Sequence, residues 1–67
     1  MKITLNNRPE EISGEEISIQ QLITYKNFTF KLLVTKLNGK LVKKENRGQA
    51  MIRDGDKVDV IHLISGG

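Results

Sequence analysis

Three stretches of the chain alternate apolar and polar residues with a period of two, namely residues 1–5, 31–37 and 57–64. This period is typical of β-strands with one face in the core and one face in solvent. Each stretch is too short and too polar to be read as a membrane segment. The pattern therefore predicts three main strands spread over the whole chain.

Turn sequences add two shorter strands. Asn6-Asn7-Arg8 and Asn38-Gly39 are typical of tight turns, because Asn and Gly adopt positive φ angles at low cost. Residues 10–12 and 40–42 follow these turns and are predicted to return along the preceding strands. We expect residues 43–48 to be a polar loop and residues 49–52 to run back to the body of the domain.

One helix is predicted between the strands. Ser18-Ile19-Gln20-Gln21 fits a capping box, in which the Ser18 hydroxyl and the Gln21 side chain each bond the other residue's backbone. Ile19, Leu22 and Ile23 follow at the spacing of one helical face, and the helix should run to about Lys26. A helix of about two turns depends on packing against a sheet. The expected fold class is therefore a two-layer α+β domain with one sheet face covered.

Strand parity divides the apolar residues between two faces. The expected core beneath the helix consists of Ile3, Leu5, Leu22, Leu33, Leu37, Val58 and Val60. Parity also directs His62 inward, so we expect it to pack rather than to take part in chemistry. Val34, Ile61 and Leu63 fall on the opposite, open face, where apolar side chains indicate a partner-binding surface.

Composition narrows the function classes. The chain has 67 residues, no Cys and one His, which excludes disulfides and thiol nucleophiles and argues against a zinc site. We therefore expect one domain with no catalytic side chain and no bound metal, too small to bury a substrate in a cleft. The N-terminus lacks the apolar run of a signal peptide, so we expect a soluble cytoplasmic protein that does not act at a membrane.

The net charge of +3 is unevenly distributed. Residues 1–30 carry three basic and four acidic side chains, whereas residues 31–67 carry eight basic and four acidic ones. A basic half is compatible with nucleic acid, an acidic partner or a simple solvated surface. The aromatic residues Tyr25, Phe28 and Phe30 lie outside the most basic stretch, which argues against a nucleic-acid-binding sheet.

The C-terminal tripeptide Ser65-Gly66-Gly67 follows directly on the last predicted strand. Glycine there adds no packing and costs conformational entropy. It does provide an arm without side chains that ends in a carboxylate and can enter a narrow channel. We expect residues 1–64 to form the folded domain and residues 65–67 to form a flexible tail, although fraying at a chain end is the alternative reading.

The order of these segments resembles the bacterial sulfur carriers of the β-grasp, ubiquitin-like class, and most of all the ThiS family of thiamine-biosynthesis carriers. The resemblance rests on residues 1–5 and on Ser18-Ile19-Gln20-Gln21-Leu22-Ile23, Leu37-Asn38-Gly39-Lys40-Leu41-Val42, Asp54-Gly55-Asp56-Lys57-Val58-Asp59-Val60 and Ile64-Ser65-Gly66-Gly67. Such carriers often have Pro-Arg and then an aromatic residue after the Asn-Gly turn strand. At those positions this chain has Lys43, Lys44 and Arg47.

The resemblance implies a β-grasp fold and a chemistry at the C-terminus. A ThiF-type adenylating enzyme is expected to use ATP to join AMP to the Gly67 carboxylate, and a persulfide donor to convert it into a thiocarboxylate. Thiazole synthase is the expected acceptor of the sulfur. Gly66 is expected to provide clearance for the tail, and Val34, Ile61 and Leu63 to contact the partners. The chain itself is expected to be a monomer when free, to bind no permanent cofactor and to be a carrier rather than an enzyme.

Other functions share parts of this pattern. The small subunit of molybdopterin synthase has the same expected fold and terminal Gly-Gly, although those chains are usually longer and often have prolines before the tail. A ubiquitin-like modifier joined to lysines of other proteins requires the same activated Gly67. A scaffold or nucleic-acid module that uses the basic half is a further alternative.

Overall fold

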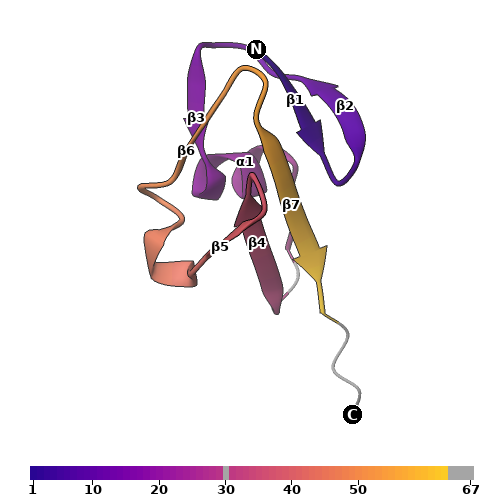
Figure 1. The fold of residues 1–67 in the computed structure, drawn as a ribbon. Coiled ribbons are helices and arrows are strands. Elements are labelled where there is room, and N and C mark those ends of the chain that lie inside the picture. The colour runs from indigo at the N-terminus through magenta and orange to yellow at the C-terminus, as the bar shows by residue number, and fades with distance from the viewer. Residues whose placement is uncertain (30, 64–67) are drawn as a thin grey trace.

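The structure is a computed structural model that describes residues 1–29 and 31–63 (Figure 1). Its elements, in chain order, are β1 (Lys2–Leu5), β2 (Arg8–Glu11), β3 (Glu16–Ser18), α1 (Ile19–Tyr25), β4 (Leu33–Leu37), β5 (Lys40–Val42), the 3₁₀ turn η1 (Lys44–Asn46), β6 (Met51–Arg53) and β7 (Lys57–His62). The predictions for Phe30 and for the tail, including the boundary after residue 64, lie outside the described residues.

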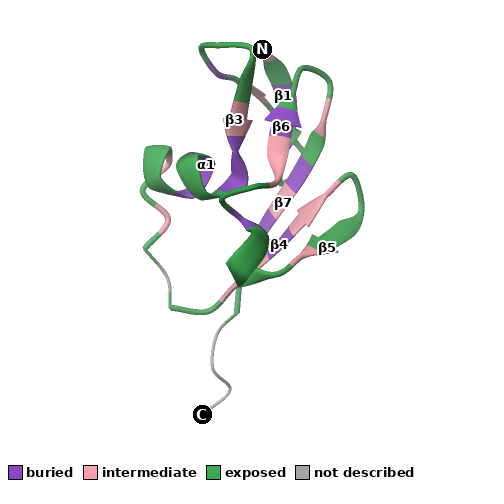
Figure 2. Cartoon of the chain, turned by 90° about the vertical axis from the view of Figure 1, so that its left-hand side faces the viewer, coloured by how far each residue is buried: buried purple, intermediate pink, exposed green. Residues whose placement is uncertain are grey.

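Five strands form one mixed sheet in the order β2-β1-β7-β4-β5. The first and last strands of the chain, β1 and β7, lie side by side and run parallel, whereas all other neighbours in this sheet are antiparallel. Helix α1 covers one face of the sheet, so the described part of the chain has two layers (Figure 2). This arrangement is the β-grasp fold, and the predicted fold class is confirmed.

Both predicted hairpins form, and their turns explain why. Asn6 and Asn7 have φ angles of 51° and 65°, and Asn38 and Gly39 have φ angles of 52° and 83°. Positive φ at both central residues is the geometry of the tight turn whose twist matches that of the flanking strands. Asn and Gly are the residues that adopt it most easily, so the local sequence by itself determines where β1 and β4 reverse.

Hydrogen bonds close both ends of α1. At its start, the Gln21 amide donates to the Ser18 hydroxyl (3.0 Å) and the Ser18 amide donates to the Gln21 side chain (2.9 Å), which confirms the capping box. At its end, Asn27 takes a positive φ and the Phe28 amide donates to the Ile23 carbonyl at 3.0 Å. This is a Schellman motif, which turns the chain so that Phe28 packs against the core.

The buried core consists of Ile3, Leu5, Ile12, Ile19, Leu22, Ile23, Ile52, Val58 and Val60. Two residues of the predicted core, Leu33 and Leu37, are only partly buried and pack against its margin. Between them Thr35 is completely buried, although it is polar. Strand parity is therefore correct for β4, and at its centre the buried side chain of Arg47 donates to the Thr35 hydroxyl.

One strand was not anticipated, and two further expectations need correction. Residues 16–18 form β3, which pairs with β6 as a separate two-stranded sheet that no sequence pattern indicated. The predicted loop at residues 43–48 contains η1. His62 is exposed rather than packed inward, because it pairs with Leu33 at the end of the sheet, where the covering layer stops.

Candidate functional site: the open sheet face and the exit of the tail

The sheet face opposite α1 carries the predicted partner-binding residues. Val34 and Ile61 are direct cross-strand partners, so their side chains lie next to each other on the same face. Ile61 is 43% exposed and Leu63 is 47% exposed, whereas Val34 is partly buried. The expectation that Ile61 and Leu63 point to solvent is confirmed; what they bind remains a prediction.

Two leucines that sequence reasoning left out extend this surface. Leu32 is 51% exposed and precedes β4, and Leu41 is 63% exposed in the middle of β5. Leu41 is paired with Lys36, which is paired on its other side with Asp59. We call Leu32, Val34, Leu41, Ile61 and Leu63 the apolar patch. The exposure of Leu41 was not evident from the sequence because three residues are too few to show a periodicity.

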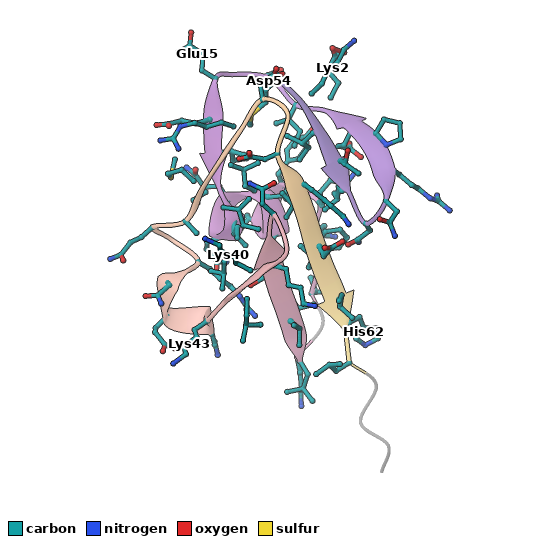
Figure 3. The ribbon with its side chains drawn as sticks, in the orientation of Figure 1. Lys2, Glu15, Lys40, Lys43, Asp54 and His62 are labelled. Carbon is teal, nitrogen blue, oxygen red and sulfur yellow. The ribbon has the colours of Figure 1, made fainter. Side chains whose placement is uncertain are left out.

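The described part of the chain ends at Leu63, at the edge of this patch. The Leu63 amide donates to the Leu32 carbonyl at 3.0 Å, one residue beyond the end of β7. This bond prolongs the β4–β7 pairing to the last described residue before the tail. Gly66 and Gly67 lie outside the described residues, so their predicted roles are not tested by the structure. Figure 3 shows His62 at the end of β7.

A side chain continues the sheet where β1 ends. The Asn6 amide donates to the Val58 carbonyl (2.9 Å), and the Asn6 side-chain oxygen accepts a bond from the Val60 amide (2.8 Å). The Asn6 side chain thus takes the place of the next residue of β1 beside β7. Since a buried amide without a partner is costly, this bond secures the part of β7 that leads to the tail.

The Arg47 side chain also takes the place of a missing strand residue. It does so where β5 ends, on the side of β4 that faces away from β7. Its Nε donates to the Thr35 hydroxyl at 3.1 Å, and its Nη2 donates to the Leu33 carbonyl at 2.6 Å. Thr35 is paired with Val42, the last residue of β5, so the Leu33 carbonyl has no strand partner on that side. The guanidinium group therefore supplies the missing donor.

The backbone of the Arg47 segment also holds the helix. The Arg47 and Ala50 carbonyls accept bonds from the Gln20 and Ile19 amides, both at 3.0 Å. Together with the Ser18 cap, these bonds satisfy the first three amides of α1, which have no partner within a helix. Sequence reasoning placed Arg47 in a polar loop and missed this role, since a lone Arg in a basic stretch gives no sign that it is buried.

Other kinds of site have no support in the described residues. Among residues 1–29 and 31–63 no group of His, Asp and Glu side chains is placed to hold a metal ion. Within the same ranges, no helix has the length and apolar character that crossing a membrane requires. The features that remain are the apolar patch and the strand end that carries the tail.

Comparison with known proteins identifies the family. The sequence model of the ThiS family matches residues 3–67, which is nearly the whole chain and includes the terminal glycines. The chain belongs to the ThiS family. The predicted resemblance is thus confirmed over both the folded domain and the tail.

The solved structures agree with this assignment, and two uncharacterized proteins are similar in sequence. The crystal structure of the thiamine biosynthesis protein ThiS from Geobacter metallireducens superposes with a TM-score of 0.88 at 25% identity, over the whole of both chains. The solution structure of a thiamine biosynthesis protein from the same organism gives 0.80 at 25% identity and covers 88% of that chain. The uncharacterized protein ycf40 is 30% identical in Trieres chinensis, over 91% of this chain and 84% of the relative. The uncharacterized ycf40 protein of Porphyra purpurea is also 30% identical, over 100% of this chain and 93% of the relative.

Proposed function

We propose that this ThiS-family protein carries sulfur on its C-terminus for the synthesis of the thiazole moiety of thiamine. The observation that carries the proposal is the family match to residue 67, because it includes the terminal Gly66-Gly67 as well as the β-grasp domain. The match to a ThiS structure over the full length of both chains supports it. The strand β7, which ends at His62, brings the chain to the tail beside an exposed apolar surface.

The proposed chemistry takes place on the Gly67 carboxylate. A carboxylate is a poor acyl donor because its leaving group would be oxide. A carboxylate oxygen therefore attacks the α-phosphorus of ATP, pyrophosphate leaves, and an acyl adenylate forms. The terminal sulfur of a persulfide then attacks the carbonyl carbon and AMP leaves. A thiol cleaves the resulting acyl disulfide, which leaves the thiocarboxylate on Gly67 and a new disulfide on the donor.

The chain supplies no acid, base or metal to these steps in this proposal. ATP is used by a ThiF-type adenylating enzyme, the sulfur comes from a persulfide donor, and thiazole synthase receives it. Gly66 gives the tail clearance, because any Cβ widens the chain and restricts its backbone. Val34, Ile61 and Leu63 contact the partner proteins. Removal of these apolar side chains from water lowers the free energy of the complex.

Intact-mass spectrometry tests this function. The purified chain is incubated with ATP, the ThiF-type enzyme encoded in the same genome and a persulfide donor. We expect a mass increase that corresponds to exchange of one oxygen for sulfur. A variant that lacks Gly67 should keep its melting temperature, because a terminal glycine has no side chain to bury and a chain end contributes little to folding, and should gain no sulfur.

Two results would contradict the proposal. One is sulfur uptake by the variant without Gly67, which would place the acceptor elsewhere in the chain. The other is a wild-type chain that the adenylating enzyme does not modify at all. Formation of an amide between Gly67 and a lysine of another protein, with no thiocarboxylate, would instead indicate a ubiquitin-like modifier.

A further inference from the structure

Asn38 joins the turn after β4 to the first residue of β7. The Asn38 amide donates to the Lys57 carbonyl at 2.7 Å, and the Lys57 amide donates to the Asn38 side-chain oxygen at 2.8 Å. Asn38 and Lys57 are the next pair in the β4–β7 register after Leu37 and Val58. The side chain of Asn38 therefore takes the place of its own carbonyl and prolongs the pairing where the chain turns away.

The nitrogen of the same side chain binds a carboxylate. Asn38 Nδ2 donates to Asp56 Oδ1 at 3.1 Å, and Asp56 Oδ2 accepts a bond from the Arg53 amide at 2.8 Å. The side chain at position 38 thus needs an acceptor toward Lys57 and a donor toward Asp56. A neutral amide offers both, whereas a carboxylate is only an acceptor. We call the two bonds of the Asn38 side chain, to the Lys57 amide and to Asp56, the turn clamp.

The turn clamp depends on a residue that can react with its own backbone. Asn38-Gly39 is the one Asn-Gly pair in the sequence. Asn is a thermolabile residue, and a following glycine leaves its amide nitrogen accessible because it has no Cβ. Both residues are exposed, so water reaches the turn.

The reaction is deamidation through a cyclic imide. The Gly39 nitrogen attacks Asn38 Cγ and forms a bond to it, the bond from Cγ to Nδ2 breaks, and the proton of the Gly39 amide leaves with Nδ2 as ammonia. Water then opens the imide at either carbonyl. The product is an aspartate, or an isoaspartate whose backbone contains one extra methylene group.

The folded turn opposes the first step. The imide ring contains the Cα–C bond of Asn38 and holds Cβ next to the Gly39 nitrogen across it. Asn38 and Gly39 have φ angles of 52° and 83°. In a turn of this type ψ of the first residue is about +30°, which places Cβ on the far side from that nitrogen. The turn must therefore open before the ring closes, and the turn clamp and the pairing of Leu37 with Lys40 resist this opening.

Deamidation removes the turn clamp permanently. A carboxylate at position 38 still accepts a bond from the Lys57 amide, but it has no donor for Asp56 and brings a second negative charge beside it. In the isoaspartate product, the extra methylene group disrupts the two-residue turn. Both products therefore hold the start of β7 less firmly than Asn38 does.

We propose that Asn38 is a site of spontaneous deamidation, which the closed turn clamp suppresses. A chain that opens at this end of the sheet is converted irreversibly into a less stable form, so the modified fraction records the time that the chain has spent open. This inference does not depend on the proposed function.

Peptide mapping by mass spectrometry measures the reaction in the full-length chain, because exchange of the amide for a carboxyl group changes the mass of the peptide that contains Asn38. We expect Asn38 to react roughly tenfold faster in guanidinium chloride than in the folded chain at the same pH, temperature and ionic strength, because the two bonds no longer hold it. Asn6 and Asn27 are followed by Asn7 and Phe28 and should react slowly in both conditions.

Two variants of the same turn provide a matched comparison. Asp56→Ala removes the acceptor of Asn38 Nδ2, whereas Asp54→Ala removes the acceptor of the Lys2 amide (2.7 Å) and leaves the turn clamp in place. In the folded state, Asp56→Ala should speed the reaction of Asn38 several-fold and Asp54→Ala should not. Thermal melts establish that each variant is folded at the temperature of the assay.

Substitution also tests the effect of the product. Asn38→Asp should unfold at a lower urea concentration than the wild type. The double variant Asn38→Asp, Asp56→Asn exchanges donor and acceptor, so it should recover much of the loss: the new amide donates to the new carboxylate, and its oxygen accepts the bond from the Arg53 amide.

Three results would overturn the inference. The first is a rate of reaction at Asn38 that is the same in the folded and the unfolded chain, or is zero in both. The second is a folded Asp56→Ala chain that reacts no faster than Asp54→Ala, which would show that the turn clamp does not suppress the reaction. The third is an Asn38→Asp variant as stable as the wild type, which would show that deamidation has no structural consequence.

Discussion

Replacement of Arg47 by Met removes the link between the η1 segment and β4. Methionine keeps most of the aliphatic bulk of the side chain but has no donor. The Thr35 hydroxyl then loses the bond it accepts, although it still donates to the Val42 carbonyl at 2.7 Å. The Leu33 carbonyl loses the donor that replaces a strand neighbour. Arg47 is 8% exposed, so water replaces these bonds only in part.

Two opposing terms set the size of the effect. Each hydrogen bond from a charged group contributes about 1.5–3 kcal/mol to stability, and the change removes two. Against this, the variant no longer buries a charge, and burial of an ion without a counter-ion costs several kcal/mol before its hydrogen bonds are counted. We expect the loss of the hydrogen bonds to outweigh the relief of the buried charge. Arg47→Met should therefore lower the free energy of unfolding by about 2 kcal/mol. A chain of this size has a free energy of unfolding of roughly 3–10 kcal/mol, so the loss is large.

Replacement by Lys makes the test sharper. A lysine keeps the buried charge, but its single ammonium group cannot reach both acceptors with the geometry of the planar guanidinium. Arg47→Lys should therefore lower the free energy of unfolding at least as much as Arg47→Met, although it conserves charge. Urea unfolding curves of both variants give the comparison. Arg53→Met is the control, since the ion pair of Arg53 with Glu16 is exposed and should contribute about 0–1 kcal/mol.

A result of either of two kinds would refute this reasoning. If Arg47→Met unfolds at the same urea concentration as the wild type, the guanidinium bonds contribute nothing beyond the cost of burying the charge. If Arg47→Lys is more stable than Arg47→Met, the positive charge contributes to stability and the planar geometry of the guanidinium group does not.

Further predictions concern the core, the patch and the tail. Leu22→Ala should cost about 2–5 kcal/mol, because Leu22 is fully buried under the sheet, and an unchanged melting temperature would contradict its place in the core. Ile61→Asp or Leu63→Asp should weaken the complex with the adenylating enzyme, measured by titration calorimetry, and leave the melting temperature near that of the wild type; unchanged affinity would show that the apolar patch is not the docking surface. Gly66→Val should slow AMP transfer to the tail with no effect on folding. If the variant accepts AMP at the wild-type rate, the tail does not need a glycine at this position for clearance.

The sequence by itself determined the local structure of this protein. The Asn6-Asn7 and Asn38-Gly39 turns, the capping box at Ser18 and the parity of β7 all depend on residues that are adjacent or three or four positions apart. Their energies are local, since they arise from backbone angles, helix-end hydrogen bonds and the alternation of side chains along a strand. The fold class followed because one short amphipathic helix among strands must cover a sheet face.

Tertiary structure alone decided which polar residues are buried and where strands end. Arg47 is buried because β5 stops at Val42 and leaves a carbonyl of β4 without a partner, a fact that requires the register of two strands. Strand β3 exists because β6 lies beside it, and its three residues have no pattern of their own. His62 is exposed although parity directs it inward, because the covering layer ends before the strand does. In each case the deciding energy belongs to contacts between segments far apart in the chain, which no local pattern contains.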